Sequence, residues 1–214
     1  MAFLNHGLLA LGAYLLGSIP TGFLVAKARG IDIRTVGSGN IGATNALRVL
    51  GKPAGILVFL IDTLKGWLAV AVLAPWLARV CGPVAGAETE VVFRVIAAIG
   101  AVLGHNYTCW LKFKGGKGIA TSAGVLLALV PWALLIIFTA FVVVLLLTRY
   151  VSAGSIAASA ALPPATWLTT HNLLLTAVTS AMTVLAIYKH KANIQRLLAG
   201  TESRLRFGKG EAVK

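Results

Sequence analysis

Two glycine-rich segments hold most of the residues that could bind an anion. The first covers residues 37–45 and reads Gly-Ser-Gly-Asn-Ile-Gly-Ala-Thr-Asn. Closely spaced glycines let backbone N–H groups approach an anion, and a helix that starts directly after them adds positive potential. Its GxGxxG pattern is weak evidence of a dinucleotide site, because no βαβ unit surrounds it. Neutral polar side chains come from Ser38, Asn40, Thr44 and Asn45.

Arg48 follows Thr44 by one helical turn and can add positive charge on the same face. The segment therefore predicts a phosphate-binding loop. The alternative is a glycine-rich turn that leads into a capped helix.

The second segment covers residues 112–118 and reads Lys-Phe-Lys-Gly-Gly-Lys-Gly. A lysine between glycines can point at a phosphate with little steric cost. The segment is not a Walker A motif, because Leu111 occupies the position of its first glycine and no Ser or Thr follows Lys117. The alternative is a basic loop of the kind found at the cytoplasmic surface of membrane proteins.

Two further groups of polar residues lie later in the chain. Ser152 and Ser155 are three residues apart, as are His190 and Asn193, so each pair shares one face of a helix, and Arg196 extends the second face. The alternatives are a serine pair inside an ordinary helix and a solvated amphipathic tail.

The composition indicates a membrane protein. Of the 214 residues, 58% are hydrophobic and 12% are charged, whereas soluble domains are about 45–50% apolar and about 25% charged. We expect a single all-α membrane domain over residues 1–214, because no linker interrupts the chain. The apolar runs are long enough to cross a hydrocarbon core of roughly 30 Å, and they cover residues 3–26, 53–77, 91–111, 119–148, 152–169 and 173–188.

The fourth run decides the predicted topology. As one helix, residues 119–148 would be about 45 Å long, which overshoots the bilayer. As two short helices that turn near Pro131, they give seven spans and bring nearly all the Lys and Arg residues to one face. The net charge of +13 makes this bias large. We therefore predict seven transmembrane helices with the N-terminus outside and the C-terminus in the cytoplasm; the alternative is a kink at Pro131.

Asp62 and Lys65 are three residues apart inside the second run and can pair on one helix face. Ionisable groups at such depth face the protein interior and usually mark function; the alternative is a structural pair that orients the helix. Histidines are scattered and carboxylates are scarce, so we expect no metal site and no cofactor.

The motifs and their order resemble those of the PlsY family, the bacterial acyl-phosphate-dependent glycerol-3-phosphate acyltransferases. The resemblance covers essentially the whole chain, and one departure is visible: Thr108 stands in the region where the family usually has a proline. The motifs that carry it lie at residues 17–22, 37–48, 104–118 and 190–202.

The resemblance implies a reaction in which a fatty acyl group passes from acyl-phosphate to the sn-1 hydroxyl of glycerol 3-phosphate, giving lysophosphatidic acid and phosphate. This reaction is the first step of bacterial phospholipid synthesis. The resemblance also implies a multi-pass protein of the inner membrane with its active site at the cytoplasmic face. The implied partners are acyl-phosphate, glycerol 3-phosphate, membrane lipid and the soluble enzyme that makes acyl-phosphate, and no nucleic acid is expected.

By their positions in the motifs, the resemblance implies that the phosphate of the acyl donor is held by Ser38, Lys117, Ser155 and the backbone of residues 115–118. The resemblance likewise implies that glycerol 3-phosphate, the acyl acceptor, is bound by Arg48, His190 and Asn193. No His-x4-Asp dyad is present, so the general base is either His190 or a phosphate oxygen of the substrate. The expected catalytic residues are Ser38, Arg48, Lys117, His190 and Asn193, and the expected substrate-binding residues are Gly37, Gly39, Asn40, Thr44, Asn45, Lys114, Gly115, Gly116, Gly118, Ser152 and Ser155.

Two other classes compete with this interpretation. A transporter or flippase for a phosphorylated anion should place charge near the bilayer midplane on broken helices, yet only Asp62 and Lys65 are expected at that depth. A non-catalytic lipid-binding protein would bind the same ligands without turnover.

Overall fold

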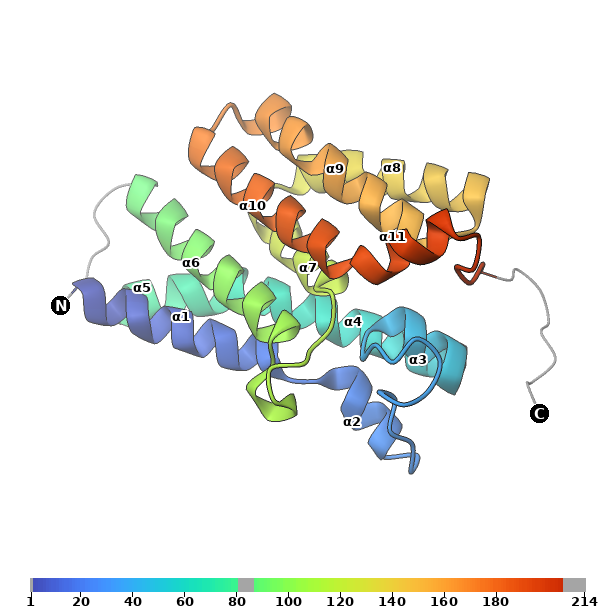
Figure 1. The fold of residues 1–214 in the computed structure, drawn as a ribbon. Helices are drawn as coiled ribbons and strands as arrows, with labels where there is room; N and C mark the ends of the chain where they lie inside the picture. Colours follow the sequence, from blue (N-terminus) through green and yellow to red (C-terminus); the bar gives the residue numbers. More distant parts are fainter. Residues whose placement is uncertain (1, 81–86, 206–214) are drawn as a thin grey trace. The chain divides into compact units, whose positions relative to one another are not determined.

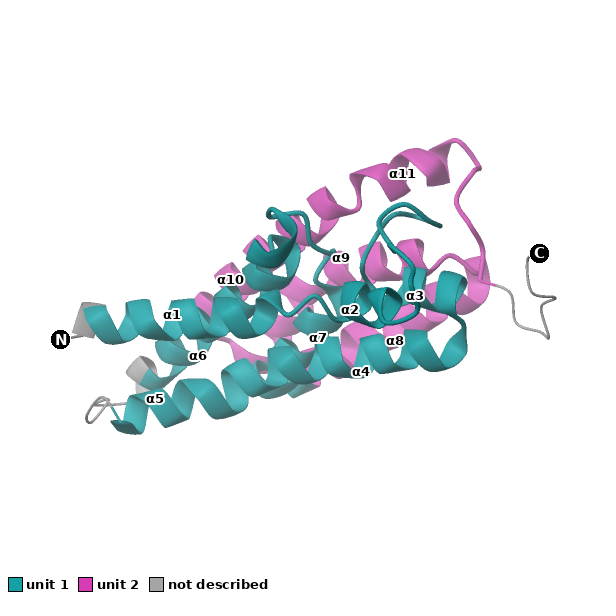
Figure 2. Cartoon of the chain, turned by 90° about the horizontal axis from the view of Figure 1, so that it is seen from below, with its two compact units in different colours: residues 1–131 teal, residues 132–214 magenta. Residues whose placement is uncertain are grey.

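The computed structural model describes residues 2–80 and 87–205, and these residues form helices and loops without a β-strand (Figure 1). The all-α prediction is therefore confirmed for this part of the chain. The chain divides into two compact units, residues 1–131 and residues 132–214 (Figure 2).

Unit 1 contains two pairs of closely packed helices. In the first pair α1 packs against α6, because Gly17 and Gly104 let the backbones approach: a Cβ on either glycine would collide with the opposite helix. In the second pair α4 packs against α7, where Gly66 and Gly124 have the same role. The elements are α1 Ala2–Ser18, α2 Thr21–Lys27, α3 Ala43–Leu50, α4 Lys52–Leu68, the π-helical turn η1 Ala69–Leu73, α5 Ala74–Val80, α6 Ala87–Asn106, the 3-10 turn η2 Cys109–Leu111 and α7 Ile119–Leu129.

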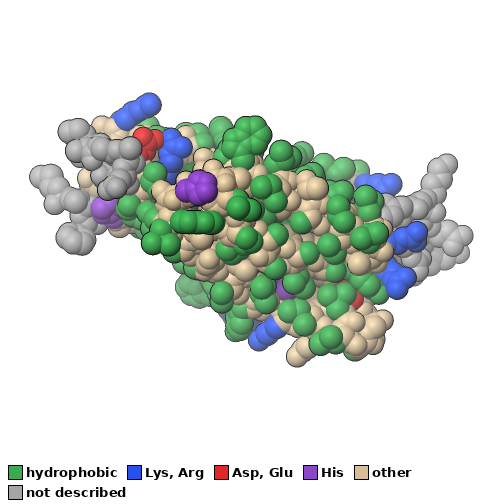
Figure 3. Space-filling model, turned by 90° about the horizontal axis from the view of Figure 1, so that it is seen from above, with side chains coloured by type: hydrophobic (Ala, Val, Ile, Leu, Met, Phe, Trp, Pro, Cys, Tyr) green, Lys and Arg blue, Asp and Glu red, His purple; other side chains and the backbone are tan. Residues whose placement is uncertain are grey.

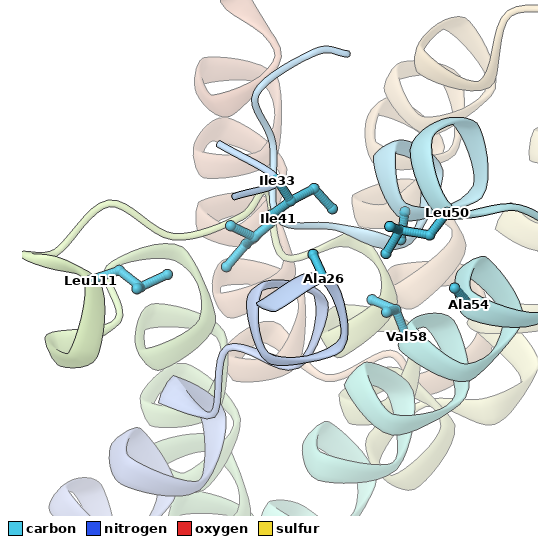
Figure 4. Packing of buried hydrophobic residues seen from close by; sticks show 8 residues of the cluster. Ala26, Ile33, Ile41, Leu50, Ala54, Val58 and Leu111 are labelled. Carbon is cyan, nitrogen blue, oxygen red and sulfur yellow. The ribbon is translucent and has the colours of Figure 1, made fainter. Parts of the chain in front are cut away.

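A small hydrophobic core fixes the loop between α2 and α3. Side chains of the loop itself, Ile33 and Ile41, are buried against α2, α3 and α4 (Figure 4). Burial of such side chains is worth about 1.5–3 kcal/mol each, so the glycine-rich loop is anchored from both ends. The whole cluster comprises Ala26, Ile33, Ile41, Ala46, Leu50, Ala54, Val58 and Leu111.

Unit 2 is formed mainly by α8 Pro131–Thr148, α9 Val151–Thr170, α10 Leu173–Lys189 and α11 Lys191–Leu198. Helices α9 and α10 run side by side, and the Thr183 hydroxyl donates to the carbonyl of Ser159 at 2.7 Å. Gly154 lies against Phe141, so α9 also approaches α8 closely.

Among residues 2–80 and 87–205, four helical segments are long and apolar enough to cross a membrane, or five if the bent pair of α10 and α11 counts as one span. Helix α8 exposes a nearly continuous apolar surface in which Leu147 is 80% exposed, and hydrophobic side chains cover much of the face in Figure 3. Lipid tails are the solvent that such a surface requires. The protein is therefore a multi-pass integral membrane protein.

The predicted break at Pro131 is confirmed. Helix α7 ends at Leu129, Val130 adopts φ −143° and ψ 64°, and α8 begins at Pro131. Proline fits the first turn of a helix and disfavours a helical conformation in the residue before it. The interpretation of residues 119–148 as one helix is therefore wrong, and the side of the membrane to which the break faces stays a prediction.

Candidate active site

In the first glycine-rich segment, the Asn45 side chain holds the loop together. Asn45 lies in the first turns of α3 and is 1% exposed. Its Oδ1 accepts from the backbone N–H of Ser38 at 2.8 Å, and its Nδ2 donates to the carbonyls of Ile33 and Val36. Gly37 has a φ of 60°, and a Cβ there would collide with Asn45 Oδ1. The carboxamide therefore stabilises the turn that presents Ser38, which is exposed.

The remaining residues of this segment lead into α3 as predicted. Asn40 Oδ1 accepts from the N–H of Gly42 at 2.8 Å, and Gly42 is the residue that precedes the helix. Thr44 and Arg48 lie one turn apart on α3, and Arg48 is exposed.

Arg34, another cation of the loop between α2 and α3, takes part in an ion pair. The Arg34 guanidinium forms an ion pair with Asp32 at 2.7 Å. The side-chain hydrogen bond from Arg34, followed by the backbone one, lowers the pKa of Asp32 to about 2. The Arg34 charge is therefore paired with a carboxylate of the same loop.

The second glycine-rich segment folds back onto the C-terminal end of α6. The N–H of Gly115 donates to the carbonyl of Asn106 at 3.2 Å, and the N–H of Gly116 donates to the carbonyl of His105 at 3.0 Å. A Cβ on Gly115 would collide with the His105 carbonyl, and one on Gly116 with the His105 ring. These glycines are therefore required by close packing, and their N–H groups are engaged inside the protein.

Lys117 follows directly and stands next to the start of α7. Gly118, with φ of 81°, precedes the helix and has the left-handed conformation that favours glycine. Lys117 is half-buried, whereas Lys114 is exposed.

Asp62 and Lys65 form the predicted ion pair, with 2.8 Å between Lys65 Nζ and Asp62 Oδ1. Both side chains are buried. The pair has three further neighbours that sequence reasoning missed: Thr21 donates to Asp62 at 3.0 Å, Lys65 donates to the carbonyl of Ile19 at 2.8 Å, and His105 Nδ1 lies 3.7 Å from Asp62. No local spacing connects His105 with Asp62, because they lie on different helices.

In unit 2 the Glu202 carboxylate gathers residues from two elements. Oε1 accepts from Ser152 at 2.8 Å and from Asn193 Nδ2 at 2.7 Å, and Oε2 accepts from Arg196 at 2.6 Å. Burial raises the pKa of the Glu202 carboxyl, but the hydrogen bonds from Arg196, Asn193 and Ser152 outweigh burial and hold that pKa below its ordinary value. Glu202 was not among the site residues predicted from the sequence. The feature that could have indicated it is a carboxylate within a strongly basic tail.

The chain reaches this position by turning back after α11. Gly200 has a φ of 70°, and the N–H groups of Thr201 and Glu202 both donate to the carbonyl of Arg196. Further along, Leu205 donates to the carbonyl of Arg149 at 2.7 Å and Arg204 donates to the Tyr150 hydroxyl at 3.0 Å. The segment 201–205 is thereby tied to the start of α9.

His190 lies at the 56° bend between α10 and α11 rather than inside either helix. Its Nδ1 is 2.8 Å from the carbonyl oxygen of Ala186. Because a carbonyl can only accept, Nδ1 carries the hydrogen and Nε2 is the ring nitrogen that can accept a proton. His190 and Asn193 are both buried, and the Asn193 N–H donates to the His190 carbonyl at 2.8 Å.

The structure thus joins Ser38 to Asn45 in unit 1 and joins Ser152 to Asn193 through Glu202 in unit 2. The Ser155 hydroxyl donates to the carbonyl of Val151 in its own helix at 2.9 Å. Together these features define an all-helical integral membrane protein whose loops present cationic and hydroxyl side chains suited to a phosphorylated ligand.

Comparison with known proteins identifies the family. The family model for glycerol-3-phosphate acyltransferases matches residues 7–200, so the chain belongs to the glycerol-3-phosphate acyltransferase family. A glycerol-3-phosphate acyltransferase of Thermosynechococcus vestitus is 49% identical over 205 residues, which are 95% of this chain and 97% of the relative. One of Geobacter metallireducens is 50% identical over 199 residues, covering 93% and 97% of the two chains.

Two crystal structures of PlsY, an integral membrane glycerol 3-phosphate acyltransferase, are also similar. The glycerol 3-phosphate form has a TM-score of 0.83 and 37% identity, covering 94% of this chain and 96% of that chain. The lysophosphatidic acid form has a TM-score of 0.80 and 36% identity, covering 94% and 95%. The resemblance seen in the motifs is confirmed, and the chain is an acyltransferase rather than a transporter or a non-catalytic lipid-binding protein.

Proposed function

We propose that this protein transfers a fatty acyl group from acyl-phosphate to the sn-1 hydroxyl of glycerol 3-phosphate, releasing lysophosphatidic acid and inorganic phosphate. The observation that carries the proposal is the similarity to PlsY over 94% of this chain, in forms named for the acceptor and for the product. The choice of acyl-phosphate as donor is supported by the motifs of residues 37–48 and 112–118.

The reaction needs little covalent assistance from the protein. Acyl-phosphate is a mixed anhydride: the acceptor oxygen attacks the acyl carbon, an ester bond forms, and the bond from that carbon to the phosphate oxygen breaks. The phosphate leaves with the electron pair, and the hydroxyl proton passes to a base. Orientation of two phosphorylated substrates and compensation of their mutual repulsion are then the main tasks of the enzyme.

On the donor side, we assign Lys117, Ser38 and Ser155 to the phosphate of acyl-phosphate. Lys117 is suited to this role because it is held between a tightly packed glycine and Gly118 at the start of α7. The N–H groups of Gly115 and Gly116 already donate to α6, so we assign these glycines to the shape of the loop. Gly37, Gly39 and Asn45 shape the first loop in the same way, and Lys114 adds positive charge at the surface.

On the acceptor side, we assign Arg48, His190 and Asn193 to glycerol 3-phosphate, with Asn40, Thr44 and Ser152 as lining residues. Asn193 Nδ2 donates to Glu202, which orients a carboxamide whose Oδ1 is of the acceptor type that a glycerol hydroxyl needs. His190 Nε2 is the protein group that can take the hydroxyl proton, and a phosphate oxygen of the substrate is the alternative base.

For topology we propose seven spans within one membrane domain of residues 1–214. The four long apolar segments are joined by α7, α9 and α10. With the N-terminus outside, this count leaves residues 27–52, 112–118 and the C-terminal tail in the cytoplasm, as the excess of Lys and Arg in these segments favours. The family model crosses both compact units from residue 7 to residue 200, which supports treating the chain as one domain. The active site then faces the soluble enzyme that supplies acyl-phosphate.

The test is turnover by the purified protein in detergent. Given palmitoyl phosphate and glycerol 3-phosphate, the protein should release phosphate and form lysophosphatidic acid, and omission of either substrate should abolish product. Acyl-CoA and acyl carrier protein should give no comparable rate. Folded protein that forms no lysophosphatidic acid from acyl-phosphate would overturn the proposal, and an equal rate with acyl-CoA would overturn the donor assignment.

A further inference from the structure

The buried ion pair of α4 belongs to a larger cluster that includes α2 and α6. Asp62, Lys65, Thr21 and His105 are each 4% exposed or less. Asp62 Oδ1 accepts from Lys65 and from Thr21, and His105 Nδ1 lies 3.7 Å from the same oxygen. Since α4 lies within an apolar segment that could span the membrane, isolated charges at this place would be costly.

An ion pair alone does not require the histidine, because Lys65 already compensates the Asp62 charge. His105 connects the cluster to the second glycine-rich loop. One edge of its ring faces Asp62, and the other edge lies against Gly116, where an added Cβ would overlap with Nε2. The imidazole is therefore held between the Asp62 carboxylate and the backbone of the loop.

The main chain makes the same connection. The carbonyls of His105 and Asn106 accept from Gly116 and Gly115 at 3.0 and 3.2 Å. The next residue is Lys117. The two residues before Lys117 are thus held by a side-chain contact and two hydrogen bonds that all come from the last turn of α6.

We propose that Asp62 and His105 are positioning residues that hold the loop of residues 115–118 so that Lys117 meets the phosphate of the acyl donor, an inference that rests on the proposed function. In this role the Asp62 carboxylate, 3.7 Å from His105 Nδ1, limits the movement of the ring. The ring supports Gly116, and Gly116 precedes and so positions Lys117. A displacement of a binding group by about 1 Å can reduce a rate by about 100-fold, so small movements of the ring matter at the site.

The first experiment is a double-mutant cycle between the ring and the glycine it supports. His105→Ala should lower kcat/KM for acyl-phosphate by about 10–100-fold, while the KM for glycerol 3-phosphate stays within about twofold. Gly116→Ala should also be impaired because its methyl group meets the ring. The double variant should be less impaired than the product of the two effects, because removal of the ring makes room for the methyl group. Multiplicative effects would overturn the proposal.

The second experiment tests Asp62 without leaving a buried charge unpaired. The pair Asp62→Asn and Lys65→Met is neutral, and neutral replacements of buried ion pairs are often tolerated. We expect it to raise the KM for acyl-phosphate, and to add little to the defect of His105→Ala. A folded neutral variant with wild-type kinetics would show that the ion pair is only structural.

Tyr14→Phe is the matched control. It removes a 2.7 Å hydrogen bond from α1 to the carbonyl of Tyr107 at the same end of α6, without touching the glycine loop. It should leave both KM values within about twofold of wild type; a donor-specific defect here would show that any loosening of α6 has this effect and would overturn the proposal. His105→Gln, a smaller change, gives the same measurement if His105→Ala does not fold.

Turnover by the wild-type protein distinguishes a failure of the proposed function from a failure of the positioning role. Wild-type protein that makes no lysophosphatidic acid contradicts the proposed function itself. Active wild-type protein together with wild-type kinetics in the His105 and Asp62 variants contradicts only the positioning role.

Discussion

Asn193 Nδ2 donates to Glu202 Oε1 at 2.7 Å, so a carboxylate beyond the last helix orients a residue assigned to the acceptor substrate. The same carboxylate accepts from Ser152 on α9 and from Arg196 on α11. Two helices of unit 2, α9 and α11, are therefore held at one acidic group.

Glu202→Ala should destabilise unit 2. The side chain is 4% exposed, and a hydrogen bond to a charged group is worth about 1.5–3 kcal/mol. The loss of at least one such bond should appear as a lower midpoint of thermal unfolding in detergent. Glu90→Gln is the matched control, because Glu90 forms an exposed pair with Arg94 one turn away on α6 and such pairs contribute about 0.3–0.5 kcal/mol. Equal effects of the two substitutions would contradict the role of Glu202.

The stabilisation by Glu202 should also depend on pH. Its pKa is lowered in the folded protein from an ordinary value of 4.5, so the unfolded chain binds the proton more readily. The contribution is then fully present above pH 4.5 and is lost as the pH falls toward the lower folded pKa. The difference in unfolding midpoint between wild type and Glu202→Gln should be constant near neutral pH and shrink in acid. A difference that grows in acid would have the wrong sign.

Thr108 has a structural role that can be tested. Its hydroxyl donates to the carbonyl of Ser18 at 2.6 Å, and the residue is fully buried. Thr108→Val keeps the shape but leaves that carbonyl without this donor, which should cost about 1–3 kcal/mol of stability. Thr139→Val is the control, because the Thr139 hydroxyl donates to a carbonyl in its own exposed helix. Thermal unfolding of both variants checks the expectation, and an equal or smaller loss for Thr108→Val contradicts it.

Long-range contacts explain what the sequence alone could and could not predict. The helices follow from apolar runs, the break follows from Pro131, and the pairing of Asp62 with Lys65 follows from their spacing of three residues. The approach of His105 to Asp62 depends on how α4 packs against α6. The position of Glu202 depends on a turn at Gly200 with positive φ. No local pattern encodes either of these relationships.

The two glycine-rich segments illustrate the same limit within the site. Both segments led to the prediction that backbone N–H groups lie near an anion, and the glycines of the two segments look equivalent in the sequence. In the structure, Gly115 and Gly116 donate to α6, and Gly37 lies against the Asn45 carboxamide. Close packing explains why these positions need glycine. The sequence showed that glycines matter here, but it did not show that close packing, and not anion binding by their N–H groups, is the reason.

The seven-span topology predicts which tags share a side. A reporter fused after Lys214 should be cytoplasmic, and a reporter inserted near Asn172 should lie on the opposite side, together with a tag beside Pro131. Asn172 precedes α10 and Pro131 begins α8, so both tags fall at helix ends. Labelling of single cysteines in whole cells by an impermeant reagent gives the same answer independently. A cytoplasmic tag at Pro131 would leave α7 and α8 on one side of the membrane and contradict seven spans.

The assignment of donor and acceptor residues predicts a split in the kinetics of three variants. Lys117→Ala should raise the KM for acyl-phosphate, whereas Arg48→Ala and Asn193→Ala should act mainly through glycerol 3-phosphate. A hydrogen bond to a charged group is worth about 1.5–3 kcal/mol, which corresponds to roughly 10–150-fold in affinity. Arg48→Lys should recover only part of the loss, because arginine offers a planar fork to phosphate and lysine does not.

Steady-state kinetics with each substrate varied in turn measure this split. A contact made equally in the ground state and the transition state raises KM, and a contact made only in the transition state lowers kcat. Lys52→Ala is the control, because Lys52 is an exposed cation at the start of α4 with no assigned role at the site; it should retain wild-type kinetics with both substrates. If Lys117→Ala and Arg48→Ala behave like Lys52→Ala in folded protein, their charges serve only to orient the chain in the membrane. If both raise the two KM values together, the phosphates share their cations, and the separation into donor and acceptor residues is wrong.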